Sequence, residues 1–263
     1  MDLHLKNKRA LVTGSSQGLG YAAALALAKE GCKVAINGRE DGKIKTKAEK
    51  LQKETGSQAI GLAGDVSLPD GPEKLVHQAA ESLGGLDILI TNTGGPKPGA
   101  LESLSEEDWQ KGIDLCLMAH VRLIQSALPH LRKSNAASIL TVTSLSVKQP
   151  IPNLILSNSI RLATIGLTKS LALDLGKEGI RVNSIIPGWT ETERVTELLE
   201  VRAKANNSTV EEEAKRQAAE SPFGRMATPA EFANAAVFLV SPAASYITGV
   251  MLSVDGGMVK GTF

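Results

Sequence analysis

The stretch TGSSQGLG, residues 13–20, decides the fold of this chain because it joins a short apolar run to the start of a helical pattern. The run covers residues 9–13 and the helical pattern covers 19–30. Glycines in such a turn let the backbone approach a pyrophosphate, and a helix N-terminus offers free N–H groups to the same anion. A tight turn alone also needs glycine, but a place at the first strand-to-helix junction predicts nucleotide binding.

Beyond this turn, short runs rich in β-branched residues alternate with helical patterns. The expected strands are residues 9–13, 33–37, 59–63, 86–92, 138–143, 181–186 and 250–254. The expected helices are residues 19–30, 42–55, 69–83, 105–132, 157–176 and 229–239. This alternation predicts an α/β fold: one domain, residues 1–263, with a Rossmann-type, doubly wound parallel sheet of about seven strands.

One segment departs from this rhythm. Residues 192–219 are rich in Glu, Lys and Arg, have helical spacing, and stand between a strand and a helix. We interpret them as a mobile flap over a site rather than as a separate domain.

The bulk properties exclude several classes of partner. The net charge is +1 over 263 residues, with acidic and basic residues interspersed, so we expect no nucleic-acid or membrane-surface binding. No apolar run is long enough for a membrane helix, and the first residues lack a signal-peptide pattern, which predicts a cytoplasmic protein. The two cysteines, Cys32 and Cys116, lie in apolar patterns and are expected to be buried free thiols. We expect no metal site.

The glycine spacing, TGxxxGxG with Gly14, Gly18 and Gly20, resembles that of the short-chain dehydrogenase/reductase family. Further motifs follow in the family's order over nearly the whole chain. They are Asp65-Val66, Asn92-Thr93-Gly94, Ser144, the stretch GIRVNSIIPG ending in Pro187-Gly188, Thr192, and the C-terminal segment 223–257. The general likeness is to the 3-oxoacyl-acyl-carrier-protein reductases.

The resemblance implies a nicotinamide dinucleotide cofactor. The residues expected to bind it are Gly14, Ser15, Ser16, Gln17, Gly18, Leu19, Gly20, Arg39, Asp65, Val66, Asn92, Thr93, Gly94, Arg161, Pro187, Gly188 and Thr192.

The end of the second expected strand, AINGRE, bears on the choice between NADP(H) and NAD(H). Gly38 stands where NAD-preferring relatives carry an aspartate, which would repel a ribose 2′-phosphate, and Arg39 follows it. A guanidinium suits a phosphate, so NADP(H) is favoured over NAD(H). The alternative makes Arg39 a solvated charge, with Glu40 as a competing partner.

The family's reductases use an Asn, a Ser, a Tyr and a Lys. Alignment through Ser144 puts Ser157 at the tyrosine position and Arg161 at the lysine position, and Cys116 falls at the asparagine position, with Asp114 nearby if the helix is offset. Neither Tyr21 nor Tyr246 can reach the site by a small shift of register. We therefore predict a divergent member that lacks the active-site Tyr and Lys.

These replacements change the chemistry. A serine hydroxyl is a far weaker acid than a phenol, and Arg161 does not give up its proton. Arg161 can still donate to ribose hydroxyls, unless it is merely a surface charge. Ser157 has the alternative role of a helix N-cap.

The proton would then come from another group. Lys97 and Lys148 lie on loops beyond the fourth and fifth strands, at the edge where such folds bind ligands, although each is otherwise a solvated loop lysine. Water is a third source. His120 is interpreted as a core or interface histidine.

Two functions follow. The first is an NADP(H)-dependent oxidoreductase that acts on a small carbonyl or secondary alcohol substrate, with Ser144, Ser157, Arg161, Lys97 and Lys148 as the candidate catalytic residues. The second is an inactive NADP(H)-binding protein with a structural or sensory role. The family resemblance also implies a homotetramer, paired through helices 105–132 and 157–176 and the last strand.

Overall fold

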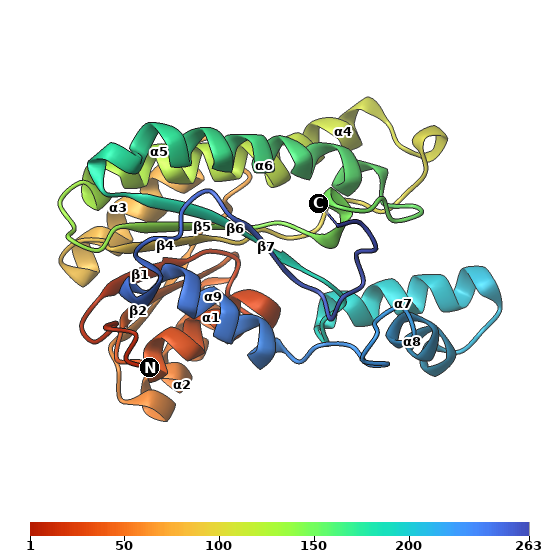
Figure 1. Cartoon of the computed structure of the whole chain (residues 1–263), viewed down its shortest axis with the longest axis horizontal. Helices are drawn as coiled ribbons and strands as arrows, with labels where there is room; N and C mark the ends of the chain where they lie inside the picture. The colour runs from red at the N-terminus through yellow and green to blue at the C-terminus, as the bar shows by residue number, and fades with distance from the viewer. Residues whose placement is uncertain (263) are drawn as a thin grey trace.

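Seven parallel strands form one twisted sheet in the computed structural model, which describes residues 1–262 (Figure 1). The strands are β1 Arg9–Val12, β2 Lys33–Gly38, β3 Ala59–Ala63, β4 Ile88–Thr91, β5 Ser138–Val142, β6 Arg181–Pro187 and β7 Met251–Val254. They lie in the order β3-β2-β1-β4-β5-β6-β7. The order reverses between β1 and β4, and ligands bind such sheets at the carboxyl edge of this reversal. The predicted α/β fold and strand number are confirmed.

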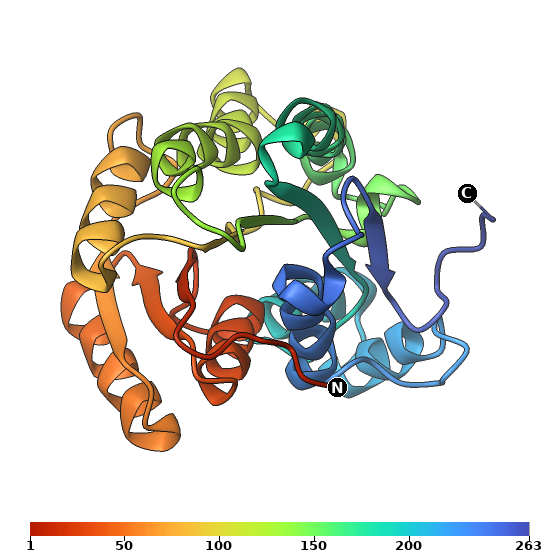
Figure 2. The ribbon, with the colours of Figure 1, turned by 60° about the vertical axis from the view of Figure 1, so that its left-hand side comes forward.

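Helices cover both faces of the sheet, as Figures 1 and 2 show. They are α1 Gly18–Lys29, α2 Asp41–Thr55, α3 Gly71–Leu83, α4 Glu106–Ile113, α5 Ala119–Leu131, α6 Ile155–Leu175, α7 Glu193–Asn206, α8 Val210–Ala218 and α9 Pro229–Val240. One core cluster joins the sheet to α1, α2 and α9, and a second joins it to α3, α5 and α6. The five inner strands are buried, which explains why their sequences are mostly apolar.

The single helix expected over residues 105–132 is instead interrupted. A π-helical turn, Asp114–Met118, separates α4 from α5. The hydroxyl of Thr164 on α6 donates to the carbonyl oxygen of Cys116 at 2.6 Å, so this carbonyl is bonded to a neighbouring helix. Apolar periodicity cannot reveal such a turn, since one extra residue in a turn barely changes the pattern.

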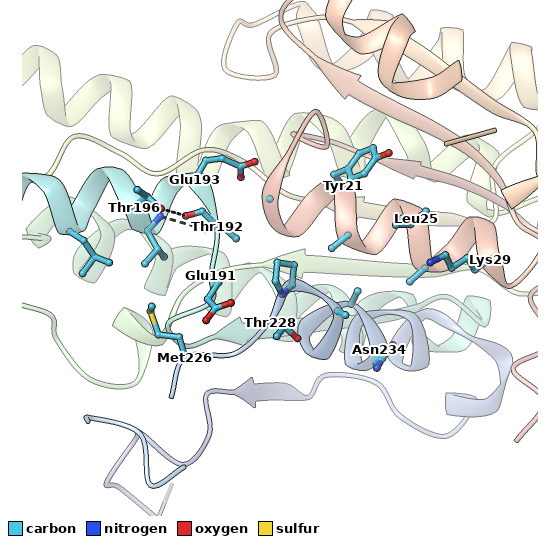
Figure 3. Close-up of a pocket in the computed structure, with 18 residues that line it drawn as sticks. Tyr21, Leu25, Lys29, Glu191, Thr192, Glu193, Thr196, Met226, Thr228 and Asn234 are labelled. Atoms are coloured by element: carbon cyan, nitrogen blue, oxygen red, sulfur yellow. Dashed lines mark hydrogen bonds between the residues drawn. The ribbon is translucent and has the colours of Figure 1, made fainter. Parts of the chain in front are cut away.

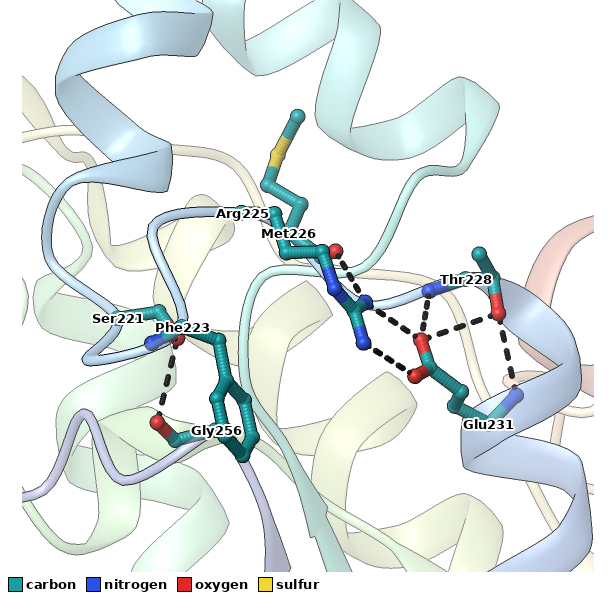
Figure 4. A network of polar contacts seen from close by, with 7 residues as sticks. All are labelled: Ser221, Phe223, Arg225, Met226, Thr228, Glu231 and Gly256. Carbon is teal, nitrogen blue, oxygen red and sulfur yellow. Dashed lines mark hydrogen bonds and ion pairs between the residues drawn. The ribbon is translucent and has the colours of Figure 1, made fainter.

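Residues 192–219 form two helices, α7 and α8, which project beyond the carboxyl edge of the sheet (Figure 1). Each begins at a threonine cap, Thr192 or Thr209, whose hydroxyl accepts a backbone N–H bond. The chain then returns to the sheet through the network of Figure 4. There Arg225 donates to Glu231 at 2.6 and 2.8 Å, and the Ser221 hydroxyl donates to the Gly256 carbonyl at 3.2 Å. Flap movement of this segment stays a prediction.

No helix within residues 1–262 is both long enough and apolar enough to cross a membrane.

Candidate active site

The glycine turn is fixed by close backbone contacts with the end of β4. A Cβ atom on Gly14, whose φ is +54°, would lie 2.7 Å from the carbonyl oxygen of Asn92. A Cβ on Gly20 would lie 2.5 Å from the carbonyl oxygen of Gly14. Both distances are shorter than any real Cβ contact, so only glycine fits at these two positions.

The N-terminus of α1 is open to a ligand. Within the described part of the chain, the Gln17 cap position makes no side-chain hydrogen bond to the first turn. The N–H groups of Gly18, Leu19 and Gly20 therefore keep the free donors that an α-helix normally leaves at its start. A glycine cradle beneath uncapped donors fits a pyrophosphate.

The β4 turn is bonded to this cradle. The Thr13 hydroxyl donates to the Asn92 carbonyl at 2.8 Å and accepts from the Asn92 N–H at 3.0 Å. The Asn92 amide donates to the Gly14 carbonyl at 2.8 Å. The Asn92-Thr93-Gly94 turn and the glycine turn thus form one rigid unit at the point where the strand order reverses.

Asn37, which sequence reasoning missed, supports the cradle from β2. It is buried, accepts from the Gly14 N–H at 3.2 Å, and donates to the carbonyls of Leu62 and Gly64 at 3.2 and 3.0 Å. The Ser15 hydroxyl accepts from the Asn37 N–H at 2.9 Å. The available signal was an amide side chain that directly follows the apolar residues 34–36 of the strand.

The candidate adenosine side lies at the end of β2. Gly38 faces Ser16, and a Cβ on Gly38 would lie 3.1 Å from the Ser16 Cβ, so a carboxylate side chain has little room there. Arg39 is exposed, and Glu40 lies 3.8 Å from Lys43 instead of pairing with Arg39. Farther along, Asp65 accepts from the N–H and hydroxyl of Ser67 at 2.9 and 2.7 Å, and Val66 is buried.

The sixth strand and the following turn reach the same edge. Pro187 ends β6, and the Gly188 N–H donates to the Val254 carbonyl at 2.9 Å. Thr192, which caps α7, lies against the glycine turn, since its Cβ would be 3.7 Å from a Cβ on Gly18. The expected cofactor residues in the turns after β1, β4 and β6 therefore lie close together.

Three serines form a cluster at the end of β5. The Ser144 hydroxyl accepts from the Ser146 N–H at 3.2 Å, and the Ser146 and Ser157 hydroxyls lie 2.9 Å apart. Ser146 and Ser157 are buried. The N-cap interpretation of Ser157 is wrong, because α6 begins at Ile155 and turns Ser157 inward. Sequence reasoning missed Ser146, because it lies in the short turn after β5, where the alternation of side chains between the two faces of a strand no longer applies.

Arg161 lies one helical turn beyond Ser157 and is only 6% exposed. Its guanidinium donates to the Gly94 carbonyl at 3.0 Å and to the Val142 carbonyl at 3.3 Å. The interpretation as a surface charge is wrong. Arg161 instead joins the ends of β4 and β5 beside the serine cluster.

Cys116 and His120 lie on the inner face of the interrupted helix, and both are buried. Burial raises the pKa of the Cys116 thiol. His120 Nδ1 lies 2.7 Å from the Thr91 hydroxyl, and burial lowers the pKa of His120 to about 3, so it is a neutral core histidine, as predicted. Asp114 binds Arg122 at 3.1 Å, outside the cluster.

The two loop lysines differ in their surroundings. Lys97 Nζ lies 2.8 Å from Asp108 Oδ2, and this hydrogen bond is the main cause that lowers the pKa of Asp108 to about 2. Lys148 follows the short 3-10 turn after Ser144 and is exposed. Neither lysine belongs to the buried serine cluster.

A groove of about 740 Å³ runs along α1, α9 and the start of α7 (Figure 3). Leu25, Leu199 and Met226 line it, and it meets the glycine turn only at Gly18. None of the candidate catalytic residues lines it.

Comparison with known proteins decides the family. A family model described as enoyl-(acyl carrier protein) reductase matches residues 14–259. The chain is 34% identical over 259 residues to dehydrogenase/reductase SDR family member 4 of Bos taurus, covering 97% of this chain and 88% of that protein. The chain belongs to the short-chain dehydrogenase/reductase family.

Other members of the short-chain dehydrogenase/reductase family match over nearly their full length. The 3-oxoacyl-acyl-carrier-protein reductase of Chlamydia muridarum is 32% identical, covering 98% of this chain and 100% of that protein. The crystal structure of L-sorbose reductase from Gluconobacter frateurii, complexed with NADPH and L-sorbose, has a TM-score of 0.94 and 33% identity, covering 99% of this chain and 100% of that chain.

Proposed function

We propose that this protein is an NADP(H)-dependent oxidoreductase that interconverts a small carbonyl compound and its secondary alcohol with an atypical active site. The observation that carries the proposal is the cluster of Ser144, Ser146, Ser157 and Arg161, built where β4 and β5 end and next to the glycine cradle. Ser157 and Arg161, which align with the Tyr and Lys of the family, are both buried and hydrogen-bonded rather than displaced to the surface.

The geometry supports an assignment of the residues that would hold the cofactor. The glycine turn and the first turn of α1 would bind the pyrophosphate, Asp65 and Val66 would bind the adenine, and Pro187, Gly188 and Thr192 would bind the nicotinamide end. Arg161 would take over the ribose contact of the missing lysine. When bound, NADPH supplies the hydride that reaches the carbonyl carbon.

The preference for NADP(H) is supported by the surroundings of Gly38. Ser16 crowds the position where an aspartate would discriminate against a 2′-phosphate, and Arg39 is not engaged by Glu40. The Arg39 guanidinium and the Ser16 hydroxyl would both be able to donate hydrogen bonds to a ribose 2′-phosphate beside Gly38. The L-sorbose reductase relative is likewise described as an NADPH complex.

The proposed chemistry divides two tasks between different residues: binding of the substrate oxygen and delivery of the proton. Ser144 holds its oxygen against the Ser146 N–H, so its own proton is free to hydrogen-bond the substrate oxygen. Neither Ser157 nor Arg161 is a workable general acid near neutral pH. Because Lys97 is held by Asp108, we assign proton delivery to Lys148 or to water passing the Ser146–Ser157 hydroxyl pair.

The test begins with cofactor binding. Fluorescence titration should give a lower Kd for NADPH than for NADH in the wild-type protein. Arg39→Gln should weaken NADPH binding by about tenfold, the loss of one charge-assisted contact, and leave NADH binding unchanged. Lys43→Gln, at an exposed lysine four residues after Arg39, is the matched control. Equal Kd values for the two cofactors in the wild type would contradict the NADP(H) preference.

Turnover is the second part. A panel of ketones and aldehydes should oxidise NADPH with the wild-type protein, and Ser144→Ala should lower kcat by about 100-fold or more while NADPH still binds. Tight NADPH binding with no turnover across the panel would instead support the inactive, structural or sensory alternative.

A further inference from the structure

Two arginines from separate elements meet the same tripeptide, Gly94-Gly95-Pro96. Arg161 of α6 donates to the Gly94 carbonyl at 3.0 Å, and Arg194 of α7 donates to the Pro96 carbonyl at 3.2 Å. The Arg194 Nε lies 3.0 Å from the place where a Cβ on Gly95 would stand. The absence of a side chain at Gly95 thus gives the Arg194 guanidinium its position on this loop.

Arg161, the more buried of the two arginines, has no acidic partner among the residues that the structure describes. Among residues 1–262 its hydrogen bonds go only to backbone carbonyls, and no carboxylate forms an ion pair with it. Burial of a guanidinium that is 6% exposed and has no acidic partner is unfavourable unless an anion lies close to it.

The groups around the two arginines do not supply this anion. Cys116 keeps its proton because burial raises its pKa, although both Arg161 and Arg194 act on it in the opposite direction. His120 is neutral, and Ser146 and Ser157 are uncharged. Within residues 1–262, the acidic partner of Arg194 is Glu197, at 3.4 Å and 61% exposed, and an exposed ion pair of this kind is weak.

The contacts of Arg194 are with the loop that follows β4. The adjacent residue Glu193 is the one that approaches the glycine turn, with its Oε2 3.6 Å from the place of a Cβ on Gly18. Arg194 instead lies over Gly95 and Pro96, on the side of Arg161 and Cys116. The position of Arg194 over this loop favours contact with a ligand other than the cofactor pyrophosphate.

We propose that the substrate is an oxo acid, or the matching hydroxy acid in the reverse direction, whose carboxylate is bound by Arg194 while Ser144 binds the oxygen that reacts. This inference rests on the proposed oxidoreductase function. Arg161 adds positive potential close to this carboxylate. Arg194 leaves its partner Glu197 and forms a charge-assisted hydrogen bond with the substrate carboxylate instead. Arg194 is therefore a specificity-determining residue.

The kinetic test uses two matched pairs of compounds: 2-oxobutanoate and its methyl ester, and 4-oxopentanoate and its methyl ester. Arg194→Gln should lower kcat/KM for at least one acid by about 10- to 100-fold and change its ester by less than about threefold. Arg216→Gln, which removes an arginine from the neighbouring helix α8, is the control and should leave kcat/KM unchanged for all four compounds.

A binding test separates this inference from the proposed function. Calorimetry on the NADP⁺-loaded wild-type protein should show that at least one acid binds at least about tenfold more tightly than its ester, and Arg194→Gln should remove the difference. If the acid binds in this way but no compound turns over, the oxidoreductase function fails and the anion site stands.

Two results would overturn the anion site. One is equal binding of acids and esters, or binding of neither, by the wild-type protein. The other is an Arg194→Gln variant that loses NADPH affinity as strongly as acid affinity, because the guanidinium would then serve the cofactor pyrophosphate.

Discussion

The side chains at positions 144, 146, 157 and 161 form one hydrogen-bonded cluster at the ends of β4 and β5. The Ser157 hydroxyl lies beside that of Ser146, and the Arg161 guanidinium reaches the ends of both strands. Both side chains are buried and hydrogen-bonded, as buried polar groups must be. The cluster therefore offers hydrogen-bond donors and positive charge.

His120 gives a prediction at this scale because its folded and unfolded pKa values differ widely. Burial lowers its pKa to about 3, whereas an unfolded histidine has a pKa of about 6.5. The unfolded state therefore binds an additional proton below about pH 6.5, and the folded state loses stability as the pH falls toward 3. This loss reaches about 1.4 kcal/mol per pH unit.

Denaturant unfolding between pH 7 and pH 4.5 measures this slope, over a range above the pKa values of most carboxylates. His120→Gln, which keeps one hydrogen bond to Thr91, should flatten it. A slope that is the same in the two proteins would mean that His120 is charged or hydrated in the folded state.

At the scale of elements, the cradle depends on β2 as much as on its own glycines. Asn37→Ala removes bonds to Gly14, Leu62 and Gly64, and leaves buried backbone groups without partners. We expect the free energy of unfolding to fall by about 2–3 kcal/mol and the Kd for NADPH to rise by about tenfold. Denaturant unfolding and fluorescence titration measure the two effects.

Asn234→Ala, on the exposed face of α9, is the control and should be nearly neutral. A destabilised Asn37→Ala protein with unchanged NADPH affinity would show that Asn37 supports the fold but not the cradle.

The same elements show what the sequence can and cannot predict. Strand and helix positions follow from apolar periodicity and differ from the structure by only one or two residues at most ends, because the buried sheet leaves few alternatives. Ser144 and the glycine turn are local motifs. Ser146, Asn37 and Arg194 depend on which residues meet across loops far apart in the sequence, and the π-helical turn depends on a bond from Thr164. Such tertiary contacts cannot be predicted from local sequence patterns.

At the scale of the whole molecule, α6 presents apolar side chains that this chain does not cover. Leu162 is 50% exposed and Leu173 is 71% exposed, and eleven residues of an α-helix bring them to the same face. We propose that a second copy of the chain covers this face in a homotetramer.

Light scattering on the purified wild-type protein should give the mass of four chains. Leu162→Glu combined with Leu173→Glu should give two chains or one, because burying two carboxylates in an apolar contact is unfavourable. Leu68→Glu, at an exposed leucine outside α6, should leave the mass unchanged. A monomeric wild-type protein would contradict the proposal.

The central claim is that a bound nicotinamide cofactor transfers hydride at the serine cluster. The most direct measurement uses NADPH deuterated at its transferable position, incubated with the protein and the carbonyl panel, followed by mass spectrometry of the alcohols formed. We predict one deuterium on the former carbonyl carbon of at least one product with the wild-type protein, and about 100-fold less of it with Ser144→Ala. Saturated NADPH binding with no deuterated alcohol from any compound would contradict the claim.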